Sequence, residues 1–418
     1  MFNTLRNAWK IPDLRNKILF TLAMLIVFRV GTFISVPGMN MDAIKQLVSG
    51  GGLLGFFDTI SGGAFKNFSI FTMSITPYIN ASIIMQLLTI AIPSLEALSK
   101  EGEEGRRKIA QYVRYATVVL ALVQGVAISF GLRGYLLDRS IWTYTIVALS
   151  LTAGTAFLMW LGEQINERGI GNGISLLIFA GIVSRIPDGI NKLYTAYLGK
   201  QINILTLLIF LIIAVVIIMA VVYIQEGQRR IPVQYAKRVV GRKMYGGQST
   251  HIPLKVNQAG VIPVIFAMSL LSFPTQIASF FPQSGFYTFM MKYFNWGTIG
   301  HGILYAILIV GFTYFYTAVT FNPVEVSNNI KKYGGFIPGI RPGKPTTDFI
   351  VKSLNRITLV GAIFLALIAI VPIFFMKIIN IPVYFGSTSL LIVVGVALDF
   401  VKQVEAHMVM RNYQGFLK

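Results

Sequence analysis

The chain has 418 residues, of which 55% are hydrophobic and 12% charged, and its mean hydropathy is +0.67. Soluble proteins carry about 25% charged residues, so the composition excludes an ordinary water-soluble enzyme. The formal net charge of +20 would suit nucleic acid, anionic lipids or an acidic protein surface as a partner. There is no cysteine and the three histidines lie far apart, so the sequence predicts neither a metal site nor another cofactor.

Ten apolar segments follow one another along the chain, and most approach the roughly 20 residues that a membrane-spanning helix needs. They cover approximately residues 18–36, 70–92, 115–132, 141–161, 174–186, 204–224, 259–281, 299–321, 357–376 and 383–401. The fifth is the shortest. The first is no cleaved signal peptide, because Arg29 interrupts it and no small-residue cleavage site follows. The sequence therefore predicts an all-α polytopic membrane protein with ten transmembrane helices.

The distribution of charge supports this count. With the N-terminus inside, the inner segments hold 26 of the 36 Lys and Arg residues and the outer segments hold 9, while Arg29 lies within the first span. The acids divide 12 to 4, so the net charge is +14 inside and +5 outside. An excess of Lys and Arg on the cytoplasmic side is typical of membrane proteins. Both termini are therefore predicted to be cytoplasmic, and most of the basicity reflects topology rather than DNA binding.

The spans divide into two halves of five. Residues 1–190 carry the first five spans, residues 191–203 form the connection, and residues 204–418 carry the second five. An odd number of spans inverts the second half relative to the first, as in pseudo-symmetric transport proteins.

Three loops stand out by length or composition. The inner loops 225–258 and 322–354 are long and basic, which favours a docking surface for a large cytoplasmic partner over plain solvated loops. The outer segment 50–65 is apolar and bordered by glycines. It suits either an interfacial helix in contact with lipid or a short helix folded back into the protein, and the sequence leaves both open.

Motifs for chemistry are absent from the sequence. Gly169–Gly173 (GIGNG) lacks the dinucleotide spacing and instead predicts a turn in which Asn172 caps the next helix. Arg29 is the one charge deep in a predicted span; it either bonds exposed carbonyls in the bundle or serves a pathway. An ion-coupled transporter would place acids or histidines in mid-membrane, and an intramembrane enzyme would need a paired catalytic site; the spans contain neither.

Prolines and amides mark the second and seventh spans. Pro77 lies with Asn80 and Gln86, and Pro263 follows Asn257. Kinked helices with polar side chains suit an interface that opens and closes, although ordinary helix packing would use the same residues.

Several long strings resemble the SecY family, whose members are pore subunits of protein-conducting channels. They are FSIFTMSITPYINASIIMQLL at 68–88, KEGEEGRRKIAQYVRY at 100–115, LGEQINERGIGNGISLLI at 161–178, EGQRRIPVQYAKR at 226–238, QSTHIPLKVNQAGVIP at 248–263 and GGFIPGIRPGKPT at 334–346. The resemblance runs in order over essentially the whole chain.

The resemblance implies an hourglass pore between two five-helix halves, with a lateral gate between spans two and seven. It implies an apolar constriction, which position by position comprises Ile75, Ile79, Ile178, Ile182, Ile265 and Ile392. The i, i+4 spacing of the first two pairs would place each pair on one helix face.

The resemblance also implies that residues 52–65 form a plug on the outer side and that Gln86 and Asn257 are polar positions of the gate. Arg242, Lys243 and Arg341 match docking positions for the ribosome or the SecA ATPase. The implied function is passage of unfolded secretory polypeptides across the cytoplasmic membrane and lateral release of hydrophobic segments, without enzymatic activity. The implied partners are SecE and SecG, SecA, the ribosome, signal sequences and preproteins, with anionic lipids around them. The alternative from the halves alone is an inverted-repeat secondary transporter of a small solute.

Overall fold

The structure is a computed structural model, which describes residues 9–49, 58, 61–200, 202–235, 238–240, 243–245, 249–279, 284–294, 298–379 and 387–415. Its helices in the N-terminal half are α2 (Pro12–Gly31), α3 (Met41–Ser49), α5 (Thr76–Ala91), α6 (Pro93–Lys100), α7 (Glu103–Gly131), α8 (Ile141–Arg168), α9 (Gly173–Val183) and α10 (Ile186–Leu198). Those in the C-terminal half are α11 (Ile204–Glu226), α12 (Ile262–Ser279), α13 (Gly285–Tyr293), α14 (Ile299–Thr320), α15 (Pro323–Lys332), α16 (Lys344–Ile379) and α17 (Ser387–Gly415).

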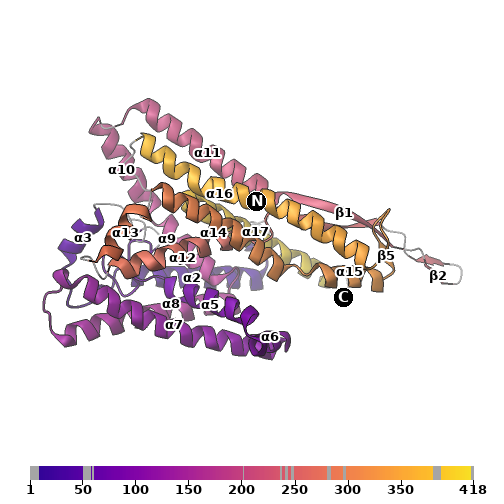
Figure 1. The fold of residues 1–418 in the computed structure, drawn as a ribbon, viewed down its shortest axis with the longest axis horizontal. Helices are drawn as coiled ribbons and strands as arrows, with labels where there is room; N and C mark the ends of the chain where they lie inside the picture. The colour runs from indigo at the N-terminus through magenta and orange to yellow at the C-terminus, as the bar shows by residue number, and fades with distance from the viewer. Residues whose placement is uncertain are drawn as a thin grey trace.

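Most of the long helices run side by side along the long axis of the molecule, with the two halves adjacent (Figure 1). Within the described residues, six helical segments are long and apolar enough to cross a membrane, and a seventh is added if the bent pair α5–α6 is one span. These seven correspond to predicted spans two to six, eight and nine. The other three predicted spans correspond to α2, α12 and α17, which do not meet both criteria over the described residues.

The structure brings the predicted inner segments together at one end of the bundle, which we call the basic end. Leu14 of α2, Ile170 between α8 and α9, and Val404 of α17 form one buried cluster there. At the same end, Lys402 of α17 pairs with Glu226, the last residue of α11, at 2.8 Å. Leu14 and Val404, near the start and the end of the described chain, therefore lie on the same side, as an even number of spans requires.

Pro77 and Pro263 do not produce the kinks predicted for the second and seventh spans; the proline inside α12 is Pro274. Pro77 and Pro263 lie in the first turns of α5 and α12, where a missing N–H costs no helical hydrogen bond, so neither proline kinks its span. Residues 70–75 are not helical, because Ser74 adopts a left-handed φ of 52° just before α5. The sharp bend occurs instead at Pro93, where α6 turns by 100° from α5.

The Gly169–Gly173 turn between α8 and α9 follows the prediction. The Asn172 side chain accepts a hydrogen bond from the Ser175 backbone N–H and so caps α9. The backbone N–H of Gly173 donates to Asn166 Oδ1 at 2.7 Å, which ties the two helices together.

Within the predicted connection 191–203, α10 continues to Leu198, so residues 199–203 separate α10 from α11. The two halves contact each other where α5 packs against α12 and where α9 packs against α17.

The two long basic loops contain the β-structure of the described chain. Strands β1 (Gln228–Tyr235) and β4 (Ser249–Lys255) pair antiparallel, and β1 also pairs with β5 (Gly335–Phe336) of the other loop. Strands β2 (Arg238–Val240) and β3 (Lys243–Tyr245) form a separate hairpin. This region projects from the basic end of the bundle (Figure 1).

Glycine at position 154 should be essential for the entry of the chain into α5. A Cβ at Gly154 would lie 1.8 Å from the backbone oxygen of Ile70, whereas a Cβ at Gly311, also within a helix, would meet nothing within 4 Å. We expect Gly154→Ala to destabilise the protein by about 3 kcal/mol or more through overpacking. We expect Gly311→Ala to stabilise it by about 0.5–1 kcal/mol. Thermal unfolding in detergent, followed by circular dichroism, measures both; equal melting temperatures would contradict the close approach of α8.

Candidate functional site

The isoleucines predicted to form the constriction converge on one buried region. Five of them belong to the largest buried cluster, with exposures of 1–7%, and Ile79 is half-buried and packs against it. They come from four elements that are far apart in the sequence: the start of α5, then α9, α12 and α17. The residues are Ile75, Ile178, Ile182, Ile265 and Ile392.

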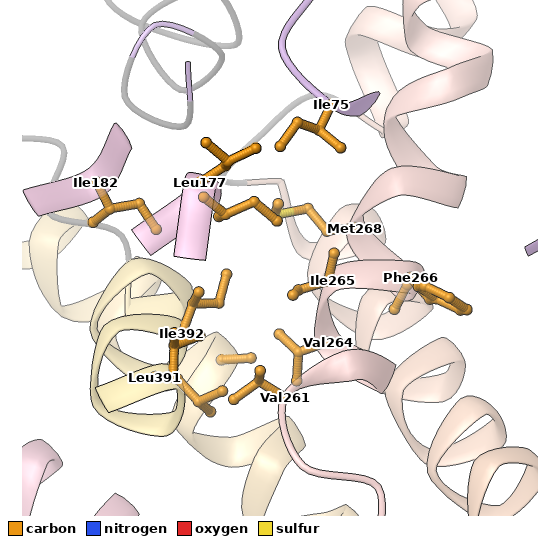
Figure 2. Packing of buried hydrophobic residues seen from close by; sticks show 14 of the residues in the cluster. Ile75, Leu177, Ile182, Val261, Val264, Ile265, Phe266, Met268, Leu391 and Ile392 are labelled. Carbon is orange, nitrogen blue, oxygen red and sulfur yellow. The ribbon is translucent and has the colours of Figure 1, made fainter. Parts of the chain in front are cut away.

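Further apolar side chains complete this region. In Figure 2, Leu177 and Ile182 of α9 face Ile75, Met268 and Ile265 across a shared centre, and Ile392 approaches from α17. Phe266 points to the other side of α12, where its ring lies edge-on to Phe312 and Tyr316 of α14. Sequence reasoning missed Leu177 and Met268, because their spacing does not distinguish them from ordinary core residues.

The start of α5 sets the position of Ile75. This residue precedes the first helical residue, but the Ile79 N–H donates to its carbonyl oxygen at 3.0 Å. Ile75 and Ile79 are therefore one helical turn apart, as predicted. In α9, Asn172 caps the first turn, and the i, i+4 spacing likewise places Ile178 and Ile182 one helical turn apart.

Hydrogen bonds link α5 to the C-terminal half. Ser269 of α12 donates its hydroxyl to Asn80 Oδ1 at 2.7 Å, and Tyr316 of α14 donates to Gln86 Oε1 at 2.5 Å. Asn257, just before α12, donates to the carbonyl of Gly260 at 2.9 Å. The two predicted gate positions, Gln86 and Asn257, thus have different partners, and the direct bond between α5 and α12 is made by Asn80 and Ser269.

The last part of the predicted plug is enclosed by the N-terminal half. Residues 61–65 are buried, with Ala64 in the cluster of the constriction and Phe65 in a second cluster. Residues 52–57, 59 and 60 lie outside the described part of the chain. Arg29, the deep charge of α2, donates to the carbonyl of Gly62. Arg29 therefore donates a hydrogen bond to a backbone carbonyl inside the bundle, which was one of its two predicted roles.

The two basic loops share one small core at the basic end. Ile231 and Val233 alternate along β1 and are buried against Leu254 of β4 and against Ile330 of α15 and Ile350 of α16. We call residues 228–255 and 323–354 together the basic module. The predicted docking loops are therefore one folded unit, which loop length and charge did not indicate.

Arg341 lies exposed on the basic module. Its carbonyl oxygen accepts a hydrogen bond from the Thr346 hydroxyl at 2.9 Å, and the carbonyl of the nearby Gly343 accepts one from the Ser327 hydroxyl at 3.0 Å. The loop is thus fixed while the side chain faces outward. Lys243 lies in β3, at the tip of the module, and Arg242 falls outside the described residues.

Comparison with known proteins agrees with this geometry. A sequence profile for the family SecY matches residues 69–401. The protein translocase subunit SecY of Halalkalibacterium halodurans is 50% identical over 434 residues, and that of Bacillus subtilis is 50% identical over 432 residues; each alignment covers 100% of both chains. The chain belongs to the SecY family.

Solved structures share the fold. A structure described as a protein-conducting channel has a TM-score of 0.71 at 21% identity and covers 94% of this chain and 93% of its own. Sec61 in a canine ribosome–channel complex has a TM-score of 0.65 at 19% identity, with 94% and 93% coverage. The helices thus form the ten-helix SecY fold. As a member of this family, the chain is a protein-conducting translocase subunit of the bacterial cytoplasmic membrane and not an enzyme, and the alternative of a small-solute transporter is wrong.

Loss of the shared core should loosen both basic loops together. We expect Leu254→Ala to destabilise the module by about 2–5 kcal/mol, because it leaves a cavity at a fully buried position. Limited proteolysis should then cut faster in residues 228–255 and also in residues 323–343. The matched control is Val324→Ala on the exposed face of α15, which should leave both rates unchanged. Faster cleavage in the first loop alone would contradict a common core.

Proposed function

We propose that Ile75, Ile79, Ile178, Ile182, Ile265 and Ile392 form the seal of the channel in its closed state. The observation that carries this proposal is their convergence from α5, α9, α12 and α17 on one buried region between the two halves. Side chains from both halves meet there, so separating the halves would open a passage through the seal.

An apolar seal fits the transport of unfolded chains. Isoleucine offers no ligand to an ion, and a narrow apolar constriction excludes water and so blocks ion flow. The same side chains make non-directional contacts, which adapt to any polypeptide that passes between them. A polar ring would bind ions or hold particular side chains of the substrate.

The lateral exit lies between α5 and α12 in this proposal. The hydrogen bonds of Asn80 with Ser269 and of Gln86 with Tyr316 support a closed but reversible interface. Hydrogen bonds between membrane helices contribute only about 0.6 kcal/mol on average, so a hydrophobic signal sequence could replace them at small cost. Gln86 and Asn257 would then lie at the inner part of this exit.

The basic module is the proposed docking surface for the SecA ATPase and the ribosome. Its shared core and the fixed loop around Arg341 support this, because a rigid surface loses little entropy on binding. Arg242, Lys243 and Arg341 would contact these partners. We further propose SecE and SecG as membrane subunits, signal sequences and preproteins as substrates, and anionic lipids around the basic end.

A polar side chain at the seal should make the closed channel leak. We expect Ile392→Asn to raise ion conductance in planar bilayers and to improve export of preproteins with weak signal sequences, because the amide attracts water. The matched control is Ile309→Asn, equally buried in α14 but not part of the seal. Its effect should be limited to stability. Ile392→Asn bilayers as tight as those of the unaltered chain would rule out the seal.

Reversal of charge at Arg341 should uncouple the SecA ATPase from the channel. We expect Arg341→Glu to block SecA-driven translocation of a preprotein into vesicles while expression stays normal. Arg341→Lys should be intermediate, because lysine keeps the charge but not the bidentate geometry. Arg106→Glu, which makes the same change at an exposed arginine of α7 outside the basic module, is the control. SecA ATPase is measured in parallel, and equal translocation by Arg341→Glu and the unaltered chain would exclude a docking role.

A further inference from the structure

A set of polar contacts holds Asp58 and residues 61–63 against the C-terminal end of α9, opposite the basic end. Arg185, which follows α9, forms an ion pair with Asp58, and the side chains are only 15% and 9% exposed. The Asp58 carboxylate also accepts the Lys66 backbone N–H at 2.7 Å. A pair so enclosed is screened by solvent far less than a surface salt bridge.

A second contact lies beside the first. Arg29 donates to the carbonyl oxygen of Gly62, and its Nη1 also lies 3.3 Å from the Ser184 hydroxyl and 3.4 Å from that of Thr32. One guanidinium thus bridges the end of α2, Gly62 and the end of α9. Charge-assisted bonds of this kind are roughly twice as strong as neutral ones.

Two glycines allow this close approach. Gly62 and Gly63 have φ values of 67° and 92°, in the left-handed region that favours glycine. A Cβ at Gly62 would lie 2.9 Å from Gly181 Cα, and a Cβ at Gly63 would lie 3.1 Å from the Arg185 guanidinium carbon. The segment is therefore fitted against α9 by backbone shape as well as by charge.

All these groups belong to the N-terminal half. Movement of α12 away from α5 opens the seal but breaks none of the contacts of Arg29 or Arg185 described above. Opening between the halves and release of the plug would therefore be separate events, with separate energetic costs.

We propose that Arg29, Ser184 and Arg185 form a latch that fastens the C-terminal end of the plug, through Asp58 and Gly62, to the N-terminal half. The latch rests on the prediction, from the family resemblance, that residues 52–65 form a plug. It keeps Asp58 and Gly62 attached when the halves part, and its two arginines are positioning residues for the closed state.

The first test removes the ion pair. Arg185→Gln in the full chain should raise the frequency of spontaneous opening in planar bilayers by about tenfold or more, since a buried charge loses its partner. Arg139→Gln, an exposed arginine between α7 and α8, is the matched control and should not differ from the unaltered chain. Opening of Arg185→Gln at the control frequency would overturn the latch.

The second test checks that the effect comes from the ion pair itself. In a double-mutant cycle, Asp58→Asn with Arg185→Gln should open no more often than the more affected of the two single variants, because all three variants remove the same interaction. Effects of Asp58→Asn and Arg185→Gln that multiply in the double variant would overturn the latch.

Ile392→Asn separates failure of the latch from failure of the seal. If Ile392→Asn leaks while both latch tests fail, the seal stands and the latch is wrong. If Ile392→Asn is tight as well, the proposed closed state itself is wrong. Leakage by Arg185→Gln together with non-additive effects in the double-mutant cycle would establish the latch.

Discussion

Apolar contact between the two halves is the interaction on which the rest of this structure depends. Ile75 of α5 and Ile178 of α9 meet Ile265 of α12 and Ile392 of α17 at one buried region, and burial of their surface holds the halves together. Such contacts have no preferred direction, so the halves can part and close again without a defined hydrogen-bond pattern to rebuild. The neighbouring Asn80–Ser269 hydrogen bond aligns α5 with α12, and breaking it costs little free energy.

The two ends of the bundle, on either side of this apolar centre, are stabilised by different kinds of interaction. At the basic end, β1, β4 and β5 join two loops through a small hydrophobic core, which makes a projecting surface rigid. At the opposite end, Arg29 and Arg185 hold an irregular segment through carbonyl and carboxylate groups. Non-helical backbone at membrane depth is tolerated where protein encloses it, and residues 61–65 meet that condition. The proposed docking surface and the proposed latch thus lie on opposite sides of the buried apolar region.

Local sequence information predicted the helices and their order well. The hydropathy pattern indicated the number of spans and the side of the termini, and the Asn172 cap was found from a single turn. Two local predictions were wrong because the same residue has different effects at different positions. Pro77 and Pro263 favour a kink inside a helix but are well suited to its first turn, and only the position of the preceding residues decides between these outcomes.

The sequence by itself determined the membrane topology and the family resemblance. Through that resemblance it also indicated the six isoleucines that the structure brings to one buried region. The tertiary structure alone decided which residues meet: Asn80 with Ser269, Gln86 with Tyr316, β1 with β5, and Arg185 with Asp58. Periodicity reports which face of a helix is apolar, because each residue's burial follows from its own helix. A contact between residues more than a hundred positions apart depends on how the helices pack, and the pattern of one segment carries no information about its partner.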